Sequence, residues 1–224
     1  TRLGKRQWPR LKQPVGLQPV TALPSPTQSI PVRLGRPLAL GQLHIVEGKS
    51  FRGGTIDVHP VLLPLVTGGA GFIGSHLVDR LLSLGHKVVV IDNLSTGKLK
   101  NLNPSATFHH LDITQPSVTE VFQREQPDLV FHLAAQVSVT QSTRDPFHDS
   151  DVNVFGTLRL LEAARKCGIE KFIYSSTGGA LYGDPETDPC TEEHPVLPVS
   201  PYGMSKYIAE LYLDLFHRLY QINF

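Results

Sequence analysis

Tyr202 and Lys206 are the residues whose types and spacing most directly indicate catalysis. They stand four apart in a predicted helix over 201–220, so their side chains project from the same helix face about one turn apart. A nearby ammonium favours phenolate and lowers the pKa of a tyrosine from about 10 toward neutrality. A general base that removes the proton of a sugar hydroxyl needs such a pKa. The alternative is a solvated pair on an amphipathic helix, because many helices contain this spacing.

Three hydroxyl residues, Ser175, Ser176 and Thr177, stand at the carboxyl end of a predicted strand over 171–175. Ligands of open α/β sheets collect at this edge, so one of the three could polarise the reacting oxygen of a substrate. The alternative is a turn in which the hydroxyls satisfy nearby backbone groups.

A glycine-rich segment follows the first predicted strand, with Gly68, Gly71 and Gly74 spaced three apart. The first glycine permits a tight turn, the second lets the backbone approach a pyrophosphate, and the third lets helix and strand pack closely. N–H groups at the start of the next helix then face the anion, so Phe72 and Ile73 are also candidates for cofactor binding. The segment therefore predicts a dinucleotide site. The alternative is a plain strand-to-helix turn.

Asp92 ends the second predicted strand, over 88–91, where the ribose of a bound dinucleotide would lie. A carboxylate there can accept hydrogen bonds from the 2′- and 3′-hydroxyls, but it would repel a 2′-phosphate. Asp92 therefore favours NAD over NADP, unless it is only a solvated strand end.

The elements that must position these groups alternate between strand and helix from residue 61 onward. This alternation predicts an α/β fold with a Rossmann-type doubly wound parallel sheet, forming an NAD-binding domain over 62–224. Pro64 interrupts the first apolar run, so we expect that strand to begin at or after Pro64. Ser200 is the predicted N-cap of the last helix, with Pro201 at its first position. The remaining predictions are strands over 106–110 and 129–133 and helices over 118–126 and 149–167. On the helix over 149–167 an apolar stripe recurs at helical spacing and is expected to form core or a partner-helix face rather than a ligand site; it consists of Val152, Phe155, Leu158, Leu161 and Ala164.

Residues 1–60 differ in composition from the rest of the chain. Seven prolines lie between residues 9 and 37, and residues 1–64 hold nine Lys or Arg against Glu47 and Asp57. We expect a Pro-rich basic leader that is disordered or non-native; Met204 is the only methionine, so Thr1 is not a translation start. The leader lacks the apolar core of a secretory signal, although its acid-poor composition leaves a transit peptide open.

Composition restricts the partners and the compartment. The net charge is +1, and residues 65–224 are acidic, so the folded part does not indicate nucleic-acid binding. No segment has the length and hydropathy of a membrane span. Cys167 and Cys190 are isolated, which favours neither a disulfide nor a metal site and suggests a reducing cytoplasm.

Taken together, the motifs resemble the extended short-chain dehydrogenase/reductase family. They are Thr67-Gly68-x-x-Gly71-x-x-Gly74, the Ser175-Ser176-Thr177 strand end with Leu181-Tyr182-Gly183, and Tyr202-x-x-x-Lys206. Within this family the chain is most similar to the NAD-dependent nucleotide-sugar epimerases of the UDP-glucose 4-epimerase type, over residues 62–224. The resemblance implies a UDP-hexose substrate and a tightly held NAD, which removes hydride from C4 and returns it to the opposite face of the keto intermediate.

The resemblance also implies roles for individual residues. Tyr202 would be the base, Lys206 its electrostatic partner and a ligand of the nicotinamide ribose, and Thr177 the hydroxyl on O4. Ser176 stays open as the alternative to Thr177, because the segment before Tyr182 is one residue longer than in relatives. Further cofactor-binding positions are Asp92 and Asn93 at the adenosine ribose, Asp112 and Ile113 at the adenine, Leu133, Ala134, Ala135 and Gln136 under the pyrophosphate and nicotinamide ribose, Asn153, Ser175 and Ser176.

Other members of the family suggest alternatives. Nucleotide-sugar dehydratases carry an Asp-Glu pair where this chain has Gly178 and Gly179, which disfavours elimination. A related reductase and a non-catalytic NAD-binding module also remain open. The resemblance implies a homodimer built from the helices over 149–167 and 201–220. Relatives continue well beyond the next strand, which is predicted over 220–224, so we expect the chain to lack most of the C-terminal substrate domain and to turn over little substrate.

Overall fold

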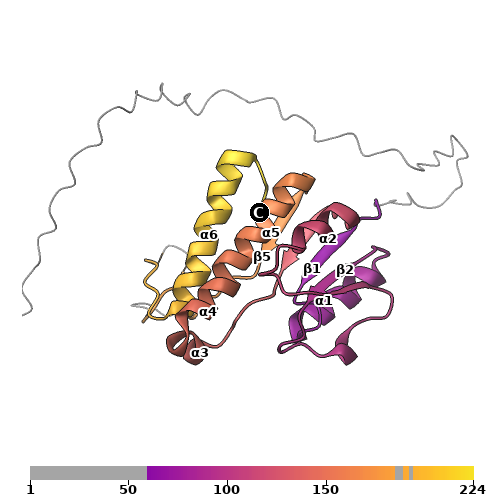
Figure 1. Cartoon of the computed structure of the whole chain (residues 1–224). Coiled ribbons are helices and arrows are strands. Elements are labelled where there is room, and N and C mark those ends of the chain that lie inside the picture. Colours follow the sequence, from indigo (N-terminus) through magenta and orange to yellow (C-terminus); the bar gives the residue numbers. More distant parts are fainter. Residues whose placement is uncertain (1–59, 185–188, 192–193) are drawn as a thin grey trace, which may run out of the picture. The chain divides into compact units, whose positions relative to one another are not determined.

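The computed structural model describes residues 60–184, 189–191 and 194–224 (Figure 1). The predicted leader, residues 1–60, lies outside the described residues except for Pro60. The described chain forms a five-stranded parallel sheet in the order β3-β2-β1-β4-β5. The strands are β1 (Pro64–Thr67), β2 (Val89–Asp92), β3 (Thr107–His110), β4 (Leu129–His132) and β5 (Lys171–Tyr174). This order confirms the predicted doubly wound α/β fold.

Helices cover both faces of the sheet. On one face α1 (Phe72–Ser83) packs through Val78 and Leu81. On the other face lie α2 (Val118–Glu125), α5 (Thr157–Cys167) and α6 (Pro201–Tyr220), the last two side by side in Figure 1. Shorter elements are η1 (Leu99–Asn101), α3 (Val139–Arg144), α4 (Pro146–Ser150) and the π-helical segment η2 (Asp151–Gly156). Among the described residues, no helix combines the length and the hydropathy that a membrane crossing needs.

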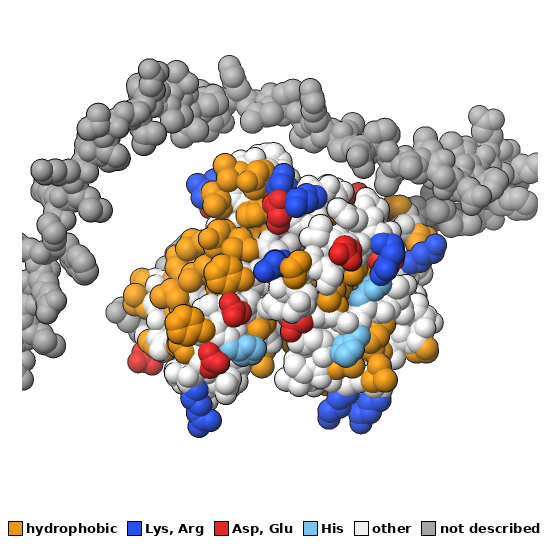
Figure 2. Space-filling view, in the orientation of Figure 1, with side chains coloured by type: hydrophobic (Ala, Val, Ile, Leu, Met, Phe, Trp, Pro, Cys, Tyr) orange, Lys and Arg blue, Asp and Glu red, His pale blue; other side chains and the backbone are white. Residues whose placement is uncertain are grey.

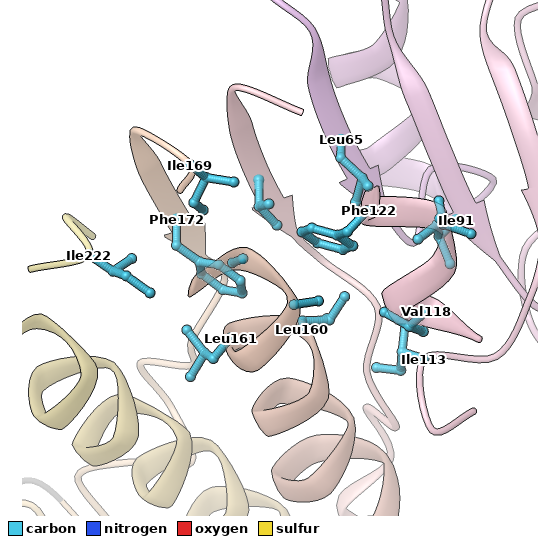
Figure 3. Close-up of a cluster of buried hydrophobic side chains, with 14 of the residues drawn as sticks. Leu65, Ile91, Ile113, Val118, Phe122, Leu160, Leu161, Ile169, Phe172 and Ile222 are labelled. Atoms are coloured by element: carbon cyan, nitrogen blue, oxygen red, sulfur yellow. The ribbon is translucent and has the colours of Figure 1, made fainter. Parts of the chain in front are cut away.

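The larger core lies between the sheet and the second helical layer. Figure 3 shows Phe122 from α2, Leu160 from α5 and Phe172 from β5 pointing toward one another beneath the strands. All three side chains are fully buried. Continuous apolar strands such as Val89–Ile91 are expected when both sheet faces are covered. This core holds the strand ends and α6 at fixed positions.

Two local predictions are confirmed. The first strand begins at Pro64. Proline has no backbone N–H to donate to a neighbouring strand, and this loss is tolerated best at the first residue of a strand. The residue before it, Leu63, donates its backbone N–H to Asp128 Oδ2 at 2.7 Å. Ser200 Oγ accepts a hydrogen bond from Gly203 N at 3.1 Å, with Pro201 at the first position of α6. Of the strand predicted over 220–224, only a parallel bridge between Lys171 and Asn223 forms, because Tyr220 still belongs to α6.

The predicted helix over 149–167 was wrong in its start. The helical region begins at Pro146, because Asp145 Oδ1 accepts a hydrogen bond from His148 N at 2.9 Å and caps it. The π-helical segment over 151–156 then adds residues per turn and shifts the register of the apolar stripe. Phe155 is consequently 55% exposed, whereas Leu161 and Ala164 are fully buried.

Candidate functional site

The glycine segment forms a tight turn between β1 and α1 that only small residues fit. Gly68 has a φ of +73°, and a Cβ there would lie 2.8 Å from Ala134 N. A Cβ on Gly74 would collide with Gly68 O. Phe72 and Ile73 lie exposed on the first turn of α1, beside its free N–H groups. These constraints fit the predicted anion cradle.

Asp92 holds this cradle from the end of β2. Asp92 is only 7% exposed, so the alternative that it is a solvated strand end is wrong. Asp92 Oδ2 accepts a hydrogen bond from Ala70 N at 2.9 Å, and Oδ1 accepts one from Leu94 N at 2.7 Å. Each carboxylate oxygen has a second lone pair, which remains available for a ribose hydroxyl.

The predicted adenine-side residues are brought close together, but they are not equivalent. Asn93 Nδ2 donates to Asp112 Oδ2 at 2.7 Å. Burial raises the pKa of Asp112, yet hydrogen bonds from Thr114 and Asn93 outweigh it and hold that pKa below its ordinary value. Ile113 is buried in the core against Gly156, so packing accounts for it.

A buried chain of hydrogen bonds under the cradle was missed by the sequence analysis. Thr157 Oγ1 donates to Asn153 O at 2.7 Å, so it must accept from His132 Nε2 at 2.9 Å. His132 Nδ1 is then the acceptor of the Thr67 hydroxyl at 2.7 Å. Burial lowers the pKa of His132 to about 3, with a smaller contribution from Lys206, which keeps the ring neutral. A lone histidine in the apolar strand over 129–133 was the available signal.

This hydrogen-bond chain positions the loop after β4. Leu133 N and Ala134 N both donate to Thr67 Oγ1 at 3.2 Å. Further along the loop, Gln136 N donates to Asn153 Oδ1 at 2.9 Å, and Asn153 Nδ2 donates to Gln136 O at 3.0 Å. The loop that includes Ala135 is therefore fixed by β1 and η2, next to the glycine cradle.

The catalytic candidates face one another across the carboxyl edge of the sheet. Lys206 is only 4% exposed, and its Nζ lies 4.5 Å from the centre of the Tyr174 ring. The Ser176 hydroxyl donates to a carboxylate oxygen of Glu210, one turn beyond Lys206 on α6. Thr177, in contrast, interacts through its side chain with Tyr202. Ser175 continues the edge of the sheet, where its N–H donates to His132 O at 3.1 Å.

The expected electrostatic effect of Lys206 on Tyr202 was wrong. Burial raises the pKa of Tyr202, Thr177 lowers it and the charge of Asp149 raises it further. Lys206 is not among the groups that shift this pKa, and its ammonium lies 4.5 Å from the centre of the Tyr174 ring. Burial also lowers the pKa of Lys206 to about 8, while Asp149 and Glu210 oppose this shift. Spacing correctly placed both residues on one buried edge, but it could not predict which group the ammonium contacts.

The described residues contain no group of three or more His, Cys, Asp or Glu side chains arranged to hold a metal ion. Cys167 and Cys190 are both free thiols.

The chain is similar in sequence to known proteins along most of its described length. A model of the family described as GDP-mannose 4,6 dehydratase matches residues 65–224. The chain is 47% identical over 160 residues to a putative UDP-glucose 4-epimerase from Methanocaldococcus jannaschii, covering 71% of the chain and 52% of that protein. It is 46% identical over 164 residues to a UDP-glucose 4-epimerase from Mycolicibacterium smegmatis, with the same coverage of both. The chain therefore spans about half the length of the curated relatives it matches.

Solved structures agree with these relatives. A UDP-glucose 4-epimerase from Thermotoga maritima, solved with UDP-glucose, is 48% identical with a TM-score of 0.71, covering 72% of the chain and 53% of that protein. A UDP-glucose 4-epimerase from Thermus thermophilus, solved with NAD, is 45% identical with a TM-score of 0.70, covering 72% and 52%.

Proposed function

The chain belongs to the NAD-dependent epimerase/dehydratase family, whose matching model is described as GDP-mannose 4,6 dehydratase. From this membership we propose that the chain supplies the NAD-binding and catalytic half of a UDP-hexose 4-epimerase. One observation carries the proposal. Tyr202 and Thr177 interact at the carboxyl edge of the sheet, on the same edge as the glycine cradle and beside the buried Lys206.

The residues present fit NAD. The cradle requires glycine at positions 68 and 74, Asp92 retains lone pairs for ribose hydroxyls, and Leu133–Gln136 are held beside the cradle. Lys206 is the cation proposed to bind the nicotinamide ribose. When bound, NAD accepts a hydride from C4 of the sugar and returns it. The carboxylate of Asp92 would repel the 2′-phosphate of NADP, so we propose selectivity for NAD.

Proton transfer is assigned to Tyr202. As the C4 hydride leaves, the phenolate oxygen takes the proton of the O4 hydroxyl, and it returns that proton when the hydride comes back to the opposite face. The hydroxyl of Thr177 hydrogen-bonds O4 and holds it next to Tyr202. Burial opposes phenolate formation here, so the interaction with Thr177 supplies part of the compensating stabilisation, and the positive nicotinamide ring of bound NAD would act in the same direction.

Epimerisation is favoured over elimination by the segment after Thr177. Gly178 and Gly179 stand where dehydratases of this family carry their acid and base, and open space surrounds both positions. No carboxylate is therefore supplied by these positions to remove water from the sugar. The relatives named as UDP-glucose 4-epimerases support the same choice.

Because the match spans about half of each relative, the activity is proposed for the protein that carries this chain. Residues 1–224 alone are expected to bind NAD and to turn over substrate slowly. We also propose a cytoplasmic location, which suits the free thiols of Cys167 and Cys190.

The test compares Tyr202→Phe with the matched variant Tyr207→Phe on the same helix. In the protein that carries this chain, Tyr202→Phe should slow interconversion of UDP-galactose and UDP-glucose about a hundred- to ten-thousandfold, whereas Tyr207→Phe should retain activity. Accumulation of NADH with substrate would instead indicate a dehydrogenase or reductase. NAD binding with no turnover in the unmodified protein would indicate a non-catalytic NAD-binding module.

A further inference from the structure

Asp149 is a buried carboxylate to which the sequence motifs assign no role. The residue has 0% exposure on α4. Its Oδ1 accepts hydrogen bonds from Gln136 Nε2 at 2.8 Å and from Asn153 Nδ2 at 3.1 Å. Its Oδ2 has no hydrogen-bond partner within the described part of the chain. A buried carboxylate oxygen without a partner is costly, which indicates that a cation or another donor satisfies it in the working protein.

Lys206 is the buried cation of the same cluster. Asn153 Nδ2 contacts both Asp149 Oδ1 and the hydroxyl of Ser205, each at 3.1 Å, so the carboxylate lies against the turn of α6 that carries Lys206. Within residues 60–184, 189–191 and 194–224, Lys206 forms no direct ion pair. Its ammonium contacts the face of Tyr174, which solvates a cation only partly.

The electrostatics of the cluster agree with this geometry. Burial lowers the pKa of Lys206 to about 8, and the first group that opposes this shift is Asp149, followed by Glu210. Glu210 already accepts the Ser176 hydroxyl, whereas Asp149 retains an oxygen without a partner. The titratable groups around Lys206 are Asp149 on α4, Tyr202 and Glu210 on α6, Tyr174 on β5 and the neutral His132 on β4.

We propose that Asp149 is the buried counter-ion of Lys206 and that it acts as a positioning residue for Tyr202 and Lys206. This inference rests on the proposed function of that pair. The carboxylate keeps the lysine charged in surroundings that favour the neutral amine. Its hydrogen bonds to Gln136 and Asn153 also tie the loop after β4 to α6, so the ammonium and the cofactor loop are positioned together.

Direct titration tests the proposal without depending on turnover. The full chain with Asp149→Asn keeps an oxygen that accepts from Gln136 and Asn153 but loses the negative charge. The side-chain ammonium signal of Lys206 is followed by NMR against pH and assigned with Lys206→Arg. Phenolate absorbance of Tyr202 is obtained as the difference from Tyr202→Phe. Asp149→Asn should lower the pH at the midpoint of both titrations, that of Lys206 and that of Tyr202. For Lys206 we expect the midpoint to fall by about one pH unit or more.

The matched control is Asp151→Asn, which removes the same charge from an exposed position two residues away. It should leave both midpoints unchanged. Unchanged midpoints in Asp149→Asn, or equal shifts in the two variants, would overturn the proposal. Because no substrate is present, this failure is separate from a failure of the proposed epimerase activity.

A double variant covers the case in which Asp149→Asn does not fold. Removing one member of a buried charge pair destabilises a protein strongly, whereas removing both relieves much of the loss. Asp149→Asn with Lys206→Met should therefore unfold at a higher temperature than Asp149→Asn alone. A double variant no more stable than the single variant would contradict the pairing.

Discussion

The Ser176 hydroxyl donates a hydrogen bond to the Glu210 carboxylate, and this bond leaves Thr177 as the strand-end hydroxyl that interacts with Tyr202. Sequence alone left Ser176 and Thr177 as alternatives for the hydroxyl on O4. The two hydroxyls have different partners in the structure, so substitution should separate a catalytic role from a packing role.

Thr177→Val keeps the shape of the side chain and removes its hydroxyl. We expect kcat for UDP-galactose conversion to fall about a hundredfold with little change in KM, because the lost hydrogen bond is made to the reacting oxygen. Ser176→Ala should instead lower the free energy of unfolding by about 1 to 3 kcal/mol, since it leaves Glu210 without its donor. The reverse pattern of kinetic and stability effects would assign the catalytic hydroxyl to Ser176.

Asp92→Asn tests whether this carboxylate selects the cofactor. An amide can accept only one of the two backbone hydrogen bonds from Ala70 and Leu94, so we expect weaker NAD binding together with a loss of stability. The ratio of the Kd values for NADP and NAD, measured by calorimetry, should fall because the like-charge repulsion of the 2′-phosphate is removed. An unchanged ratio would mean that Asp92 only supports the glycine turn.

His132 predicts an acid sensitivity of the fold. Its pKa is lowered from 6.5 to about 3 in the folded protein, so the unfolded chain binds a proton first as the pH falls. The contribution of the neutral His132 ring to the free energy of unfolding is fully present above pH 6.5. It is lost progressively as the pH falls toward 3, and the total loss is several kcal/mol. Denaturant unfolding at a series of pH values should show this loss, and His132→Gln should reduce its slope. Equal slopes for the two proteins would exclude the buried ring as the cause.

We predict that the exposed face of α6 forms part of a homodimer interface. Leu211, Leu215 and Leu219 recur four residues apart and are 50%, 36% and 60% exposed. Figure 2 shows hydrophobic side chains gathered where α6 runs in Figure 1. Leu215→Glu should convert a dimer to a monomer in light scattering, because a charge in an apolar interface is costly. The control is Leu99→Glu on η1, which is also exposed and should leave the mass unchanged. A monomeric unmodified protein would refute the prediction.

Elements and motifs were more predictable from sequence than the contacts between them. Alternating strands and helices, the Ser200 cap and the glycine turn depend on local chemistry, and each has a signal a few residues long. The π-helical segment at 151–156 has no comparable signal, so the sequence left open whether Phe155 lies in the core or on an exposed helix face. Asp149 lies on α4, distant in sequence from Tyr202 and Lys206 on α6. Its charge reaches both residues only after folding, so spacing alone could not predict its effect on the pKa of Tyr202.

The most direct test of the central claim follows a deuterium placed at C4 of UDP-galactose. The protein that carries this chain, loaded with NAD, is incubated with this substrate, and the UDP-glucose formed is analysed for its label. We predict that the deuterium stays at C4, because the same hydride is removed and returned within one site, and that Tyr202→Phe blocks the conversion. Deuterium released into free NADH, or conversion that continues unchanged in Tyr202→Phe, would contradict the account.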